Sequence, residues 1–318
     1  MSRFLPLAIV FALFLPGCSN LSKAARATAI FSQAHDFGAT AVAFSPDSRL
    51  LVSGGHQGNI RLWDVQRKSA LAEMPARDGA VRALLFLSDK TFASATDNGK
   101  LMLREGTRTI AEKKALSPIT SLAFMKGHLI SGHSDGWLRI WDGSLQETAR
   151  LKFDQGVVAL STYKDRLAVG LDKQILILDP SLKTVSMLNT GGSRPHDLQF
   201  SPDGKTLAAG NWFNLSTWDL ATGERQTHRT EHWGLLASVA YSPDGRHIVS
   251  LGRDSDSAIR MMDTLNYQVE RRYQAHALCG AMIRYSPDGR WIASASDDES
   301  VRLYDLNQAY TPRSFAAP

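Results

Sequence analysis

The chain has 318 residues, which is enough for one large domain or two ordinary ones. A hydrophobic share of 43% and a charged share of 21% exclude a disordered chain and a protein with many membrane spans. The net charge is +5 and the basic residues are scattered, whereas nucleic-acid-binding proteins usually gather theirs in one stripe.

The first twenty residues differ in composition from the rest. Arg3 supplies a positive charge, and Phe4 to Leu15 is an apolar run that suits a signal peptide and is too short to span a bilayer as a helix. The run ends in Leu15-Pro16-Gly17-Cys18, which resembles the lipobox of bacterial lipoproteins. This resemblance implies cleavage before Cys18 and acylation of its thiol. The alternative is an ordinary secretory signal followed by a coincidental cysteine.

On the lipoprotein interpretation, residues 1–17 are the signal peptide and residues 18–26 are a tether. Acyl chains on Cys18 then hold the mature protein to a lipid bilayer. The resemblance also implies a periplasm-facing lipoprotein, and Ser19 suits transfer to the outer membrane of a Gram-negative bacterium. Cys279 is the other cysteine, so an acylated Cys18 leaves no pair for a disulfide or a metal site.

A strand-and-turn unit recurs through the rest of the chain. The clearest copy has a turn over residues 242–245 and strands over residues 248–250 and 259–263. The hydrophobic residue that closes the first strand of each copy falls at positions 44, 86, 124, 160, 200, 241 and 285. These positions define seven copies at intervals of 36 to 44 residues, which leaves no room for a second domain.

The copies resemble the WD repeat, whose period is about 40–45 residues. The resemblance implies an all-β fold over residues 27–310, a single seven-bladed β-propeller of four-stranded antiparallel blades, with residues 311–318 as a C-terminal tail. Propellers of this family close by pairing an N-terminal strand into the last blade, and we expect residues 27–32 to do so. A six-bladed ring that omits one weak copy is the alternative.

His, Ser and Asp side chains recur together and look like catalytic triads. In the WD family a His, a Ser or Thr, an Asp and a Trp form a buried hydrogen-bonded chain in each blade, and the resemblance implies that role here. Because a catalytic site occurs once and these groups recur at the blade period, we expect no enzyme. The tetrad-like residues are His35, Ser53 and Trp63 in the first copy, Ser131, Asp135 and Trp141 in the third, His232, Ser250 and Asp254 in the sixth, and His276, Ser294 and Asp298 in the seventh. No copy has all four, so apolar burial should supply most of the stability.

WD propellers typically bind partners through the loops before the first strand of each blade and between its second and third strands. The residues expected there are Phe37, His56, Asp97, His133, Ser134, Arg194, His196, Asn211, Trp212, Phe213, Trp233, Arg253 and Asp297. Trp212, Phe213 and Trp233 come from neighbouring blades, and one interpretation is that they form an exposed aromatic patch, since such residues are enriched at interface hot spots. The alternative is that two of the three pack between blades.

The motifs point to no metal and no cofactor. His128 and His133 flank one strand without a carboxylate cluster, and the glycine-rich turns precede no helix that would bind phosphate. We therefore expect a membrane-anchored scaffold that binds proteins of the bacterial envelope and no nucleic acid. The alternative is an enzyme or small-molecule binder that uses the central channel. It requires carboxylates, histidines or lysines converging from several blades, and the sequence reveals no such set.

Overall fold

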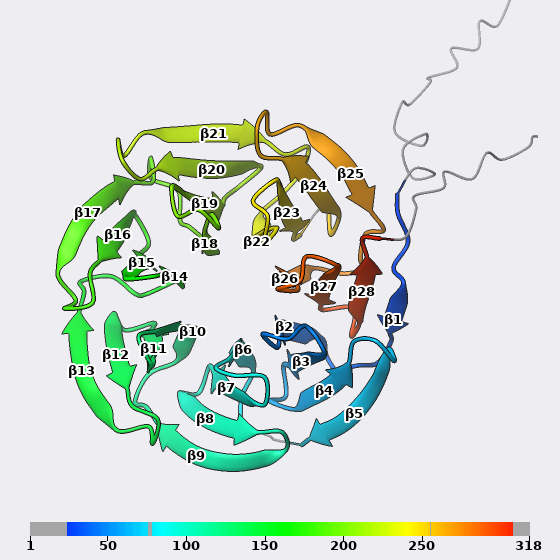
Figure 1. The fold of residues 1–318 in the computed structure, drawn as a ribbon, viewed down its shortest axis with the longest axis horizontal. Coiled ribbons are helices and arrows are strands. Elements are labelled where there is room, and N and C mark those ends of the chain that lie inside the picture. The colour runs from blue at the N-terminus through cyan, green and yellow to red at the C-terminus, as the bar shows by residue number, and fades with distance from the viewer. Residues whose placement is uncertain (1–23, 76–77, 255, 308–318) are drawn as a thin grey trace, which may run out of the picture.

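The computed structural model describes residues 24–75, 78–254 and 256–307. These residues form 28 strands in seven four-stranded antiparallel sheets, arranged as blades around a central axis (Figure 1). The seven-bladed propeller is therefore confirmed, and the six-bladed alternative is wrong. The described ranges contain no helix long and apolar enough to cross a membrane.

The blades follow one another in chain order, and each runs from an innermost to an outermost strand. Blade one consists of β2 (Ala39–Phe44), β3 (Leu50–Gly55), β4 (Ile60–Asp64) and β5 (Ser69–Met74). Blade two consists of β6 (Val81–Phe86), β7 (Thr91–Thr96), β8 (Lys100–Glu105) and β9 (Arg108–Lys114). Blade three consists of β10 (Ile119–Met125), β11 (His128–His133), β12 (Trp137–Trp141) and β13 (Glu147–Lys152). Blade four consists of β14 (Ala159–Tyr163), β15 (Arg166–Gly170), β16 (Gln174–Leu178) and β17 (Thr184–Asn189).

The remaining three blades complete the ring. Blade five consists of β18 (Leu198–Phe200), β19 (Thr206–Gly210), β20 (Asn214–Asp219) and β21 (Arg225–Arg229). Blade six consists of β22 (Leu236–Tyr241), β23 (His247–Gly252), β24 (Ile259–Asp263) and β25 (Val269–Tyr273). Blade seven consists of β26 (Gly280–Tyr285), β27 (Trp291–Ser296), β28 (Val301–Asp305) and the N-terminal strand β1 (Ala29–Phe31).

Strand β1 closes the ring, as the sequence predicted, although it is shorter than residues 27–32. It pairs antiparallel with β28, with Phe31 opposite Val301. The ring of Phe31 stacks on Trp63 of blade one at a centroid distance of 4.3 Å, so β1 links the last blade to the first. Ala25, which precedes the predicted start of the propeller at residue 27, also pairs with the propeller. It forms a parallel bridge with Tyr273 at the end of β25.

The Ser-Pro-Asp-Gly segments form the turns between the first and second strands, as expected. In blade five, Ser201 Oγ donates to Asp203 Oδ1 at 2.6 Å, and the backbone N–H of Lys205 donates to the same oxygen at 3.0 Å. Gly204 follows with φ of 70°, a conformation that glycine adopts without steric cost. The turn sequence thus satisfies its own polar groups and fixes where the second strand begins.

The hydrophobic core lies between the blades. The cluster between blades one and two joins Val52 and Ile60 from one sheet to Val81 and Phe92 of the next, and all four side chains are fully buried. The cluster between blades seven and one joins Leu51 to Trp291 in the same way. Each buried apolar surface contributes about 25 cal/mol per Å². A blade therefore depends on both neighbours for its stability.

We predict that Phe31→Ala lowers the free energy of unfolding by about 2 kcal/mol, because the partly buried ring leaves a gap against Trp63. Ile30 is the control on the same strand, since its side chain is 46% exposed, and Ile30→Ala should change stability by less than about 0.5 kcal/mol. Urea denaturation followed by tryptophan fluorescence measures both. Equal losses in the two variants would contradict the role given to the Phe31–Trp63 contact.

Candidate functional site

One face of the propeller is built from two sets of loops, which we call the entry face. It comprises the loops that lead into each innermost strand and the turns between the second and third strands of each blade. Backbone hydrogen bonds tie the two sets together: His56 donates to the Gly38 carbonyl at 3.2 Å, and Asp97 donates to the Ala80 carbonyl at 3.0 Å. These bonds fix the loops of the entry face to one another.

The aromatic patch, defined as Trp212, Phe213 and Trp233, lies on the entry face. The three residues are 55%, 52% and 77% exposed, respectively, so the alternative that two of them pack between blades is wrong. Trp212 and Phe213 contact each other with ring centroids 5.9 Å apart. The Phe213 N–H donates to the Gly234 carbonyl at 2.8 Å, which joins this turn of blade five to the Trp233 loop of blade six. That the patch binds a partner remains a prediction.

Other exposed apolar residues share this face. Among the described residues, six of the twelve large hydrophobic side chains found exposed lie in its loops: Phe37, Leu116, Trp212, Phe213, Trp233 and Leu278. Leu265, which is 93% exposed, lies instead in the turn between β24 and β25. Half of the large exposed apolar side chains therefore lie on the face expected to bind partners.

Two residues expected on the binding surface are buried instead. His133 is fully buried, and its ring lies 2.8 Å from Ser131 Oγ and 3.1 Å from Ser117 Oγ. Asn211 is 4% exposed and donates through Nδ2 to Ser216 Oγ at 2.7 Å. Both predictions are wrong for the same reason: each side chain turns inward and bonds to a serine hydroxyl.

The buried polar chains of the blades are incomplete in different ways. In blade one, Trp63 Nε1 donates to Ser53 Oγ at 2.8 Å, and Ser53 Oγ lies 2.7 Å from His35 Nε2. The other ring nitrogen of His35 lies 3.1 Å from Asn59 Oδ1, so an amide replaces the carboxylate. In blade three, Trp141 Nε1 donates to Ser131 Oγ at 2.8 Å.

Blade three and blade six also depart from the predicted residues. In blade three the imidazole is that of His133 at the end of β11, and the Asp135 carboxylate accepts from the Trp137 N–H at 3.3 Å. In blade six the His232 ring contacts Ser250 Oγ at 2.9 Å and Asp256 Oδ1 at 2.7 Å. The carboxylate is therefore that of Asp256 and not of Asp254, because the turn after β23 is longer than in the other blades.

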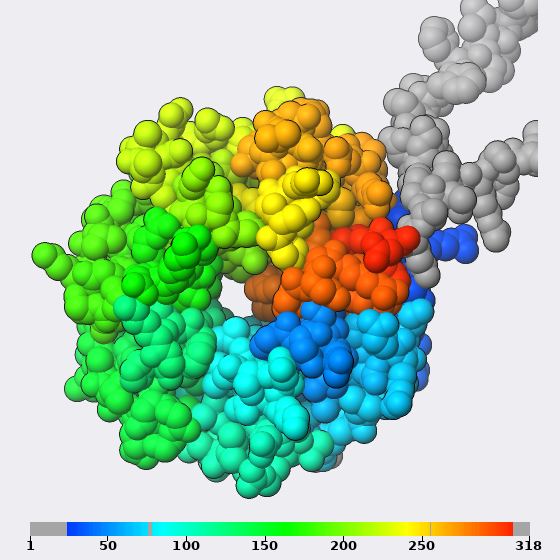
Figure 2. All heavy atoms as spheres, viewed as in Figure 1, coloured from blue at the N-terminus to red at the C-terminus, as the bar shows by residue number. Residues whose placement is uncertain are grey.

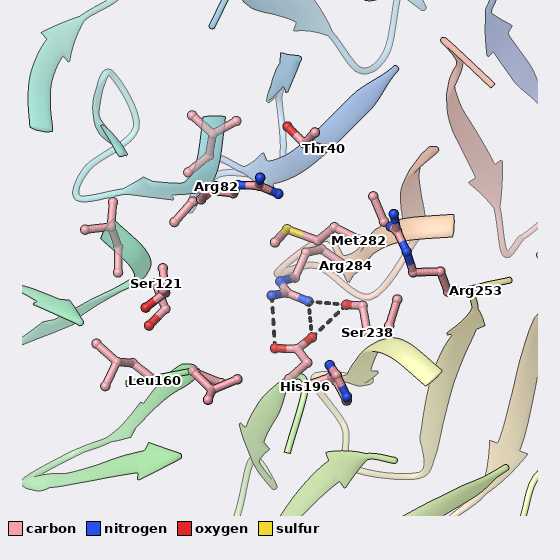
Figure 3. Close-up of a pocket in the computed structure, with 18 of the residues that line it drawn as sticks. Thr40, Arg82, Ser121, Leu160, His196, Ser238, Arg253, Met282 and Arg284 are labelled. Carbon is pink, nitrogen blue, oxygen red and sulfur yellow. Dashed lines mark hydrogen bonds and ion pairs between the residues drawn. The ribbon is translucent and has the colours of Figure 1, made fainter. Parts of the chain in front are cut away.

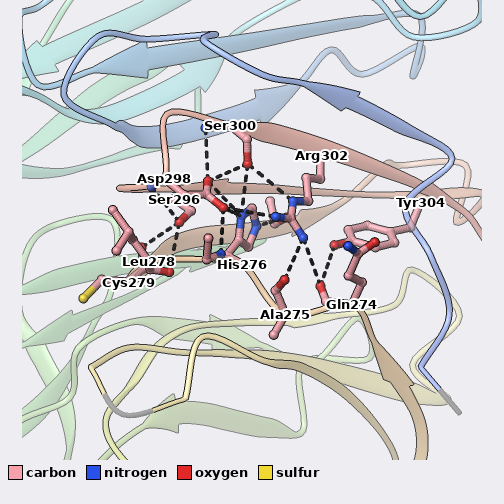
Figure 4. A network of polar contacts seen from close by, with 12 residues as sticks. Gln274, Ala275, His276, Leu278, Cys279, Ser296, Asp298, Ser300, Arg302 and Tyr304 are labelled. Atoms are coloured by element: carbon pink, nitrogen blue, oxygen red, sulfur yellow. Dashed lines mark hydrogen bonds and ion pairs between the residues drawn. The ribbon is translucent and has the colours of Figure 1, made fainter. Parts of the chain in front are cut away.

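Blade seven carries the most connected of these chains (Figure 4). His276 lies 2.8 Å from Ser294 Oγ and 3.1 Å from Asp298 Oδ2, as predicted. Asp298 also accepts from Arg302 Nη2 at 3.0 Å, and Tyr304 replaces the tryptophan and donates to the Gln274 carbonyl at 3.2 Å.

Burial decides what these groups do chemically. It lowers the pKa of both His35 and His133 to about 4, so these rings are neutral at neutral pH. The hydroxyl-bearing residues Ser53, Ser250 and Ser294 are fully buried and have no access to a substrate. The triad-like groups are therefore structural.

The centre of the ring holds a cavity of about 230 Å³, at the opening visible in Figure 2. Its lining includes the guanidinium groups of Arg82, Arg253 and Arg284 and the rings of His56 and His196, which come from different blades (Figure 3). The sequence revealed no converging charged set, and that interpretation is wrong. His56 and Arg253 hold equivalent places, each directly after the second strand of its blade, whereas Arg82, Arg284 and His196 hold different ones. The convergence of all five is visible only once the ring is closed.

Carboxylates pair with this set. Asp297 Oδ1 lies 3.1 Å from His56 Nε2, and Asp297 Oδ2 accepts from Arg253 Nη2 at 3.1 Å. Asp97 accepts from Arg82 Nη2 at 3.1 Å. Of the surface residues predicted from sequence, His56, Asp97, Arg253 and Asp297 thus lie around the channel. No group of three or more His, Cys, Asp or Glu side chains that could hold a metal ion exists in the described ranges.

Several predictions fall outside the described residues. These are the signal peptide at 1–17, the lipidation site Cys18 and the tail at 311–318; of the tether at 18–26, only residues 24–26 are described.

The family model described as WD domain, G-beta repeat (WD40), matches residues 27–64 and 268–305. Both matched segments have the same construction, since each starts on the outermost strand of one blade and continues through three strands of the next. The match therefore follows the way the blades interlock.

Three curated proteins illustrate the similarity. Periodic tryptophan protein 2 of Arabidopsis thaliana is 24% identical over 253 residues, which cover 76% of this chain and 24% of that protein. Eukaryotic translation initiation factor 3 subunit I of Culex quinquefasciatus is 22% identical over 258 residues, covering 69% of this chain and 79% of that protein. Protein HIR1 of Candida albicans is 26% identical over 194 residues, covering 55% of this chain and 21% of that protein. The chain thus spans most of one relative and about a quarter or less of the other two.

We predict that Ser53→Ala lowers the free energy of unfolding by about 2–3 kcal/mol, because Trp63 Nε1 and His35 Nε2 both lose their partner in a buried place. The control is Ser94→Ala in blade two. Ser94 Oγ is buried with no hydrogen-bond partner in the described part of the chain, so its removal should change stability by less than about 0.5 kcal/mol. Thermal and urea denaturation compare the two; a loss for Ser94→Ala as large as that for Ser53→Ala would refute the explanation.

Proposed function

We propose that this seven-bladed β-propeller, two segments of which match the WD40 repeat, is a non-enzymatic scaffold that binds protein partners through its entry face. The single observation that carries this proposal is the aromatic patch. Large aromatic side chains exposed on a protein surface often supply much of the binding energy at protein interfaces.

The geometry of the patch suits a preformed binding surface. The Trp212 turn is bridged to Leu235, and the Leu235 carbonyl accepts from the Arg253 N–H at 2.7 Å. The backbone that presents the aromatic rings is therefore fixed by strands of two blades. A fixed backbone lowers the ordering entropy that binding would otherwise require.

The relatives support the same class of function. One of them is named as a subunit, that of eukaryotic translation initiation factor 3, and so belongs to a protein assembly. The present chain covers about four fifths of that relative's length, so the similarity extends over most of that subunit. The identity of the partner does not carry over at 22% identity.

We further propose that this scaffold is a lipoprotein of a bacterial envelope, facing the periplasm and anchored to the outer membrane through acylated Cys18. The support is the sequence Leu15-Pro16-Gly17-Cys18 after an apolar run. The seven residue steps from Cys18 to Ala25 can extend over at most about 25 Å. Because Ala25 is bonded to the outermost strand of blade six, the anchor holds that rim of the ring near the bilayer.

The test of the scaffold proposal is chemical crosslinking of the acylated protein in cells, followed by affinity capture. We expect the double substitution Trp212→Ala/Trp233→Ala to remove at least one specific partner, because it deletes most of the exposed aromatic area. The control is Leu265→Ala, which removes an exposed apolar side chain outside the entry face and should leave the partners unchanged. An identical set of partners for wild type and the double variant would disprove binding through the patch.

The test of the anchor is membrane fractionation of Cys18→Ala. We expect this variant to leave the membrane fraction, since no acyl chains remain, while Cys279→Ala should stay bound because it lacks only the other thiol. Retention of Cys18→Ala in washed membranes would rule out the lipoprotein interpretation.

A further inference from the structure

The central cavity gathers three guanidinium groups from three blades. Arg82 lies on β6, Arg284 lies on β26, and Arg253 follows β23. Figure 3 shows the three side chains around the same space, with His196 beside the Arg284 contacts. The cavity, about 230 Å³, is far larger than the roughly 10–15 Å³ that one water molecule needs.

The carboxylate of Asp197 has already spent most of its capacity to accept hydrogen bonds. Asp197 Oδ2 accepts from Ser238 Oγ at 2.6 Å, from the Val239 N–H at 3.1 Å and from Arg284 Nη1 at 2.8 Å. Asp297 is shared between His56 and Arg253. A carboxylate offers about four acceptor sites, so Asp197 has little left for a cationic ligand.

The guanidinium groups, in contrast, keep unused donors. Each carries five N–H groups. The described structure gives Arg82 one hydrogen bond, to Asp97, and its side chain is 47% exposed. Arg253 uses Nη2 on Asp297 and Nη1 on the Gly280 carbonyl at 3.4 Å, and its side chain is 36% exposed. These unused donors suit a ligand that accepts hydrogen bonds, and bonds from a guanidinium are strongest when the acceptor is an anion.

His196 adds to this preference. Burial lowers the pKa of its ring, and the nearby Arg194 and Arg253 lower it further, so the imidazole is neutral at neutral pH. A neutral ring offers one N–H donor and adds no positive charge. The selectivity of the cavity for anions therefore depends on the arginines.

We propose that the central cavity is a binding site for a carboxylate, held by Arg82 and Arg253. The planar, fork-shaped guanidinium matches a carboxylate in two parallel hydrogen bonds. The carboxylate belongs either to a small free acid or to an acidic side chain of a protein bound to the entry face. The second source fits the layout, since the Arg253 backbone is bonded to Leu235 and Leu235 is bridged to Trp212 of the aromatic patch.

The first arm of the test uses citrate and isothermal titration calorimetry on the full-length protein at pH 7 and low salt. We expect Arg82→Gln and Arg253→Gln each to weaken citrate binding at least tenfold. The control is Arg108→Gln on the outermost strand β9, where Arg108 pairs with Glu105 at the rim; this variant should bind citrate as wild type does. An equal loss in the control would show that citrate responds only to overall charge and would overturn the site.

The second arm uses selection from a displayed library of random heptapeptides. If the carboxylate is an acidic side chain, wild type enriches peptides with Asp or Glu, and Arg253→Gln loses that enrichment. Citrate binding identifies a free acid as a ligand, and acidic peptides identify a partner side chain; either result supports the site. Neither citrate binding nor acidic enrichment by wild type would overturn it. Trp212→Ala/Trp233→Ala should leave citrate binding unchanged, so failure of the scaffold proposal is distinguishable from failure of this one.

Discussion

Packing between neighbouring sheets is the interaction on which the rest of this structure depends. A four-stranded sheet with two apolar faces cannot cover both by itself, and each blade here finds its cover in the blades on either side. Both faces of every sheet are covered only if the last blade packs against the first. The packing of blade seven on blade one completes the ring, and the contacts of β1 with β28 and of Phe31 with Trp63 add to it.

The buried polar chains are secondary to that packing. They vary from blade to blade: Asn59 replaces a carboxylate in blade one, Tyr304 replaces a tryptophan in blade seven, and blade two has a serine, Ser94, with no partner in the described residues. A network that tolerates such replacement cannot be the main source of stability. The network has a narrower role: it supplies hydrogen-bond partners to polar side chains that are buried near the ends of the second strands.

The sequence predicted correctly those features that depend on residues close together in the chain. The Ser-Pro-Asp-Gly turn and the spacing of the strands predicted the blade count, and the apolar segment before the first copy predicted the closing strand. It failed where a residue's position depends on the length of a turn or on closure. Asp256 reaches His232 because the turn between β23 and β24 is longer than in the other blades. His133 turns inward because its ring contacts the hydroxyl of Ser117, which lies in the loop before β10. Arg82 and Arg284 line the same cavity only when the ring is complete, and no local sequence pattern predicts this.

Closure also links the central cavity to the aromatic patch. Gly38 has φ of 108°, and a Cβ at that position would lie 2.7 Å from Asp297 Cα, so glycine there lets blade one approach blade seven. That approach brings His56 to Asp297, and Asp297 in turn holds Arg253, whose backbone is bonded to the loop behind the aromatic patch. The close approach of Gly38 to Asp297 is thus linked through hydrogen bonds to both the channel and the aromatic patch. A ring closed for stability thereby positions charged and aromatic groups that are far apart in the chain, at fixed distances on one face.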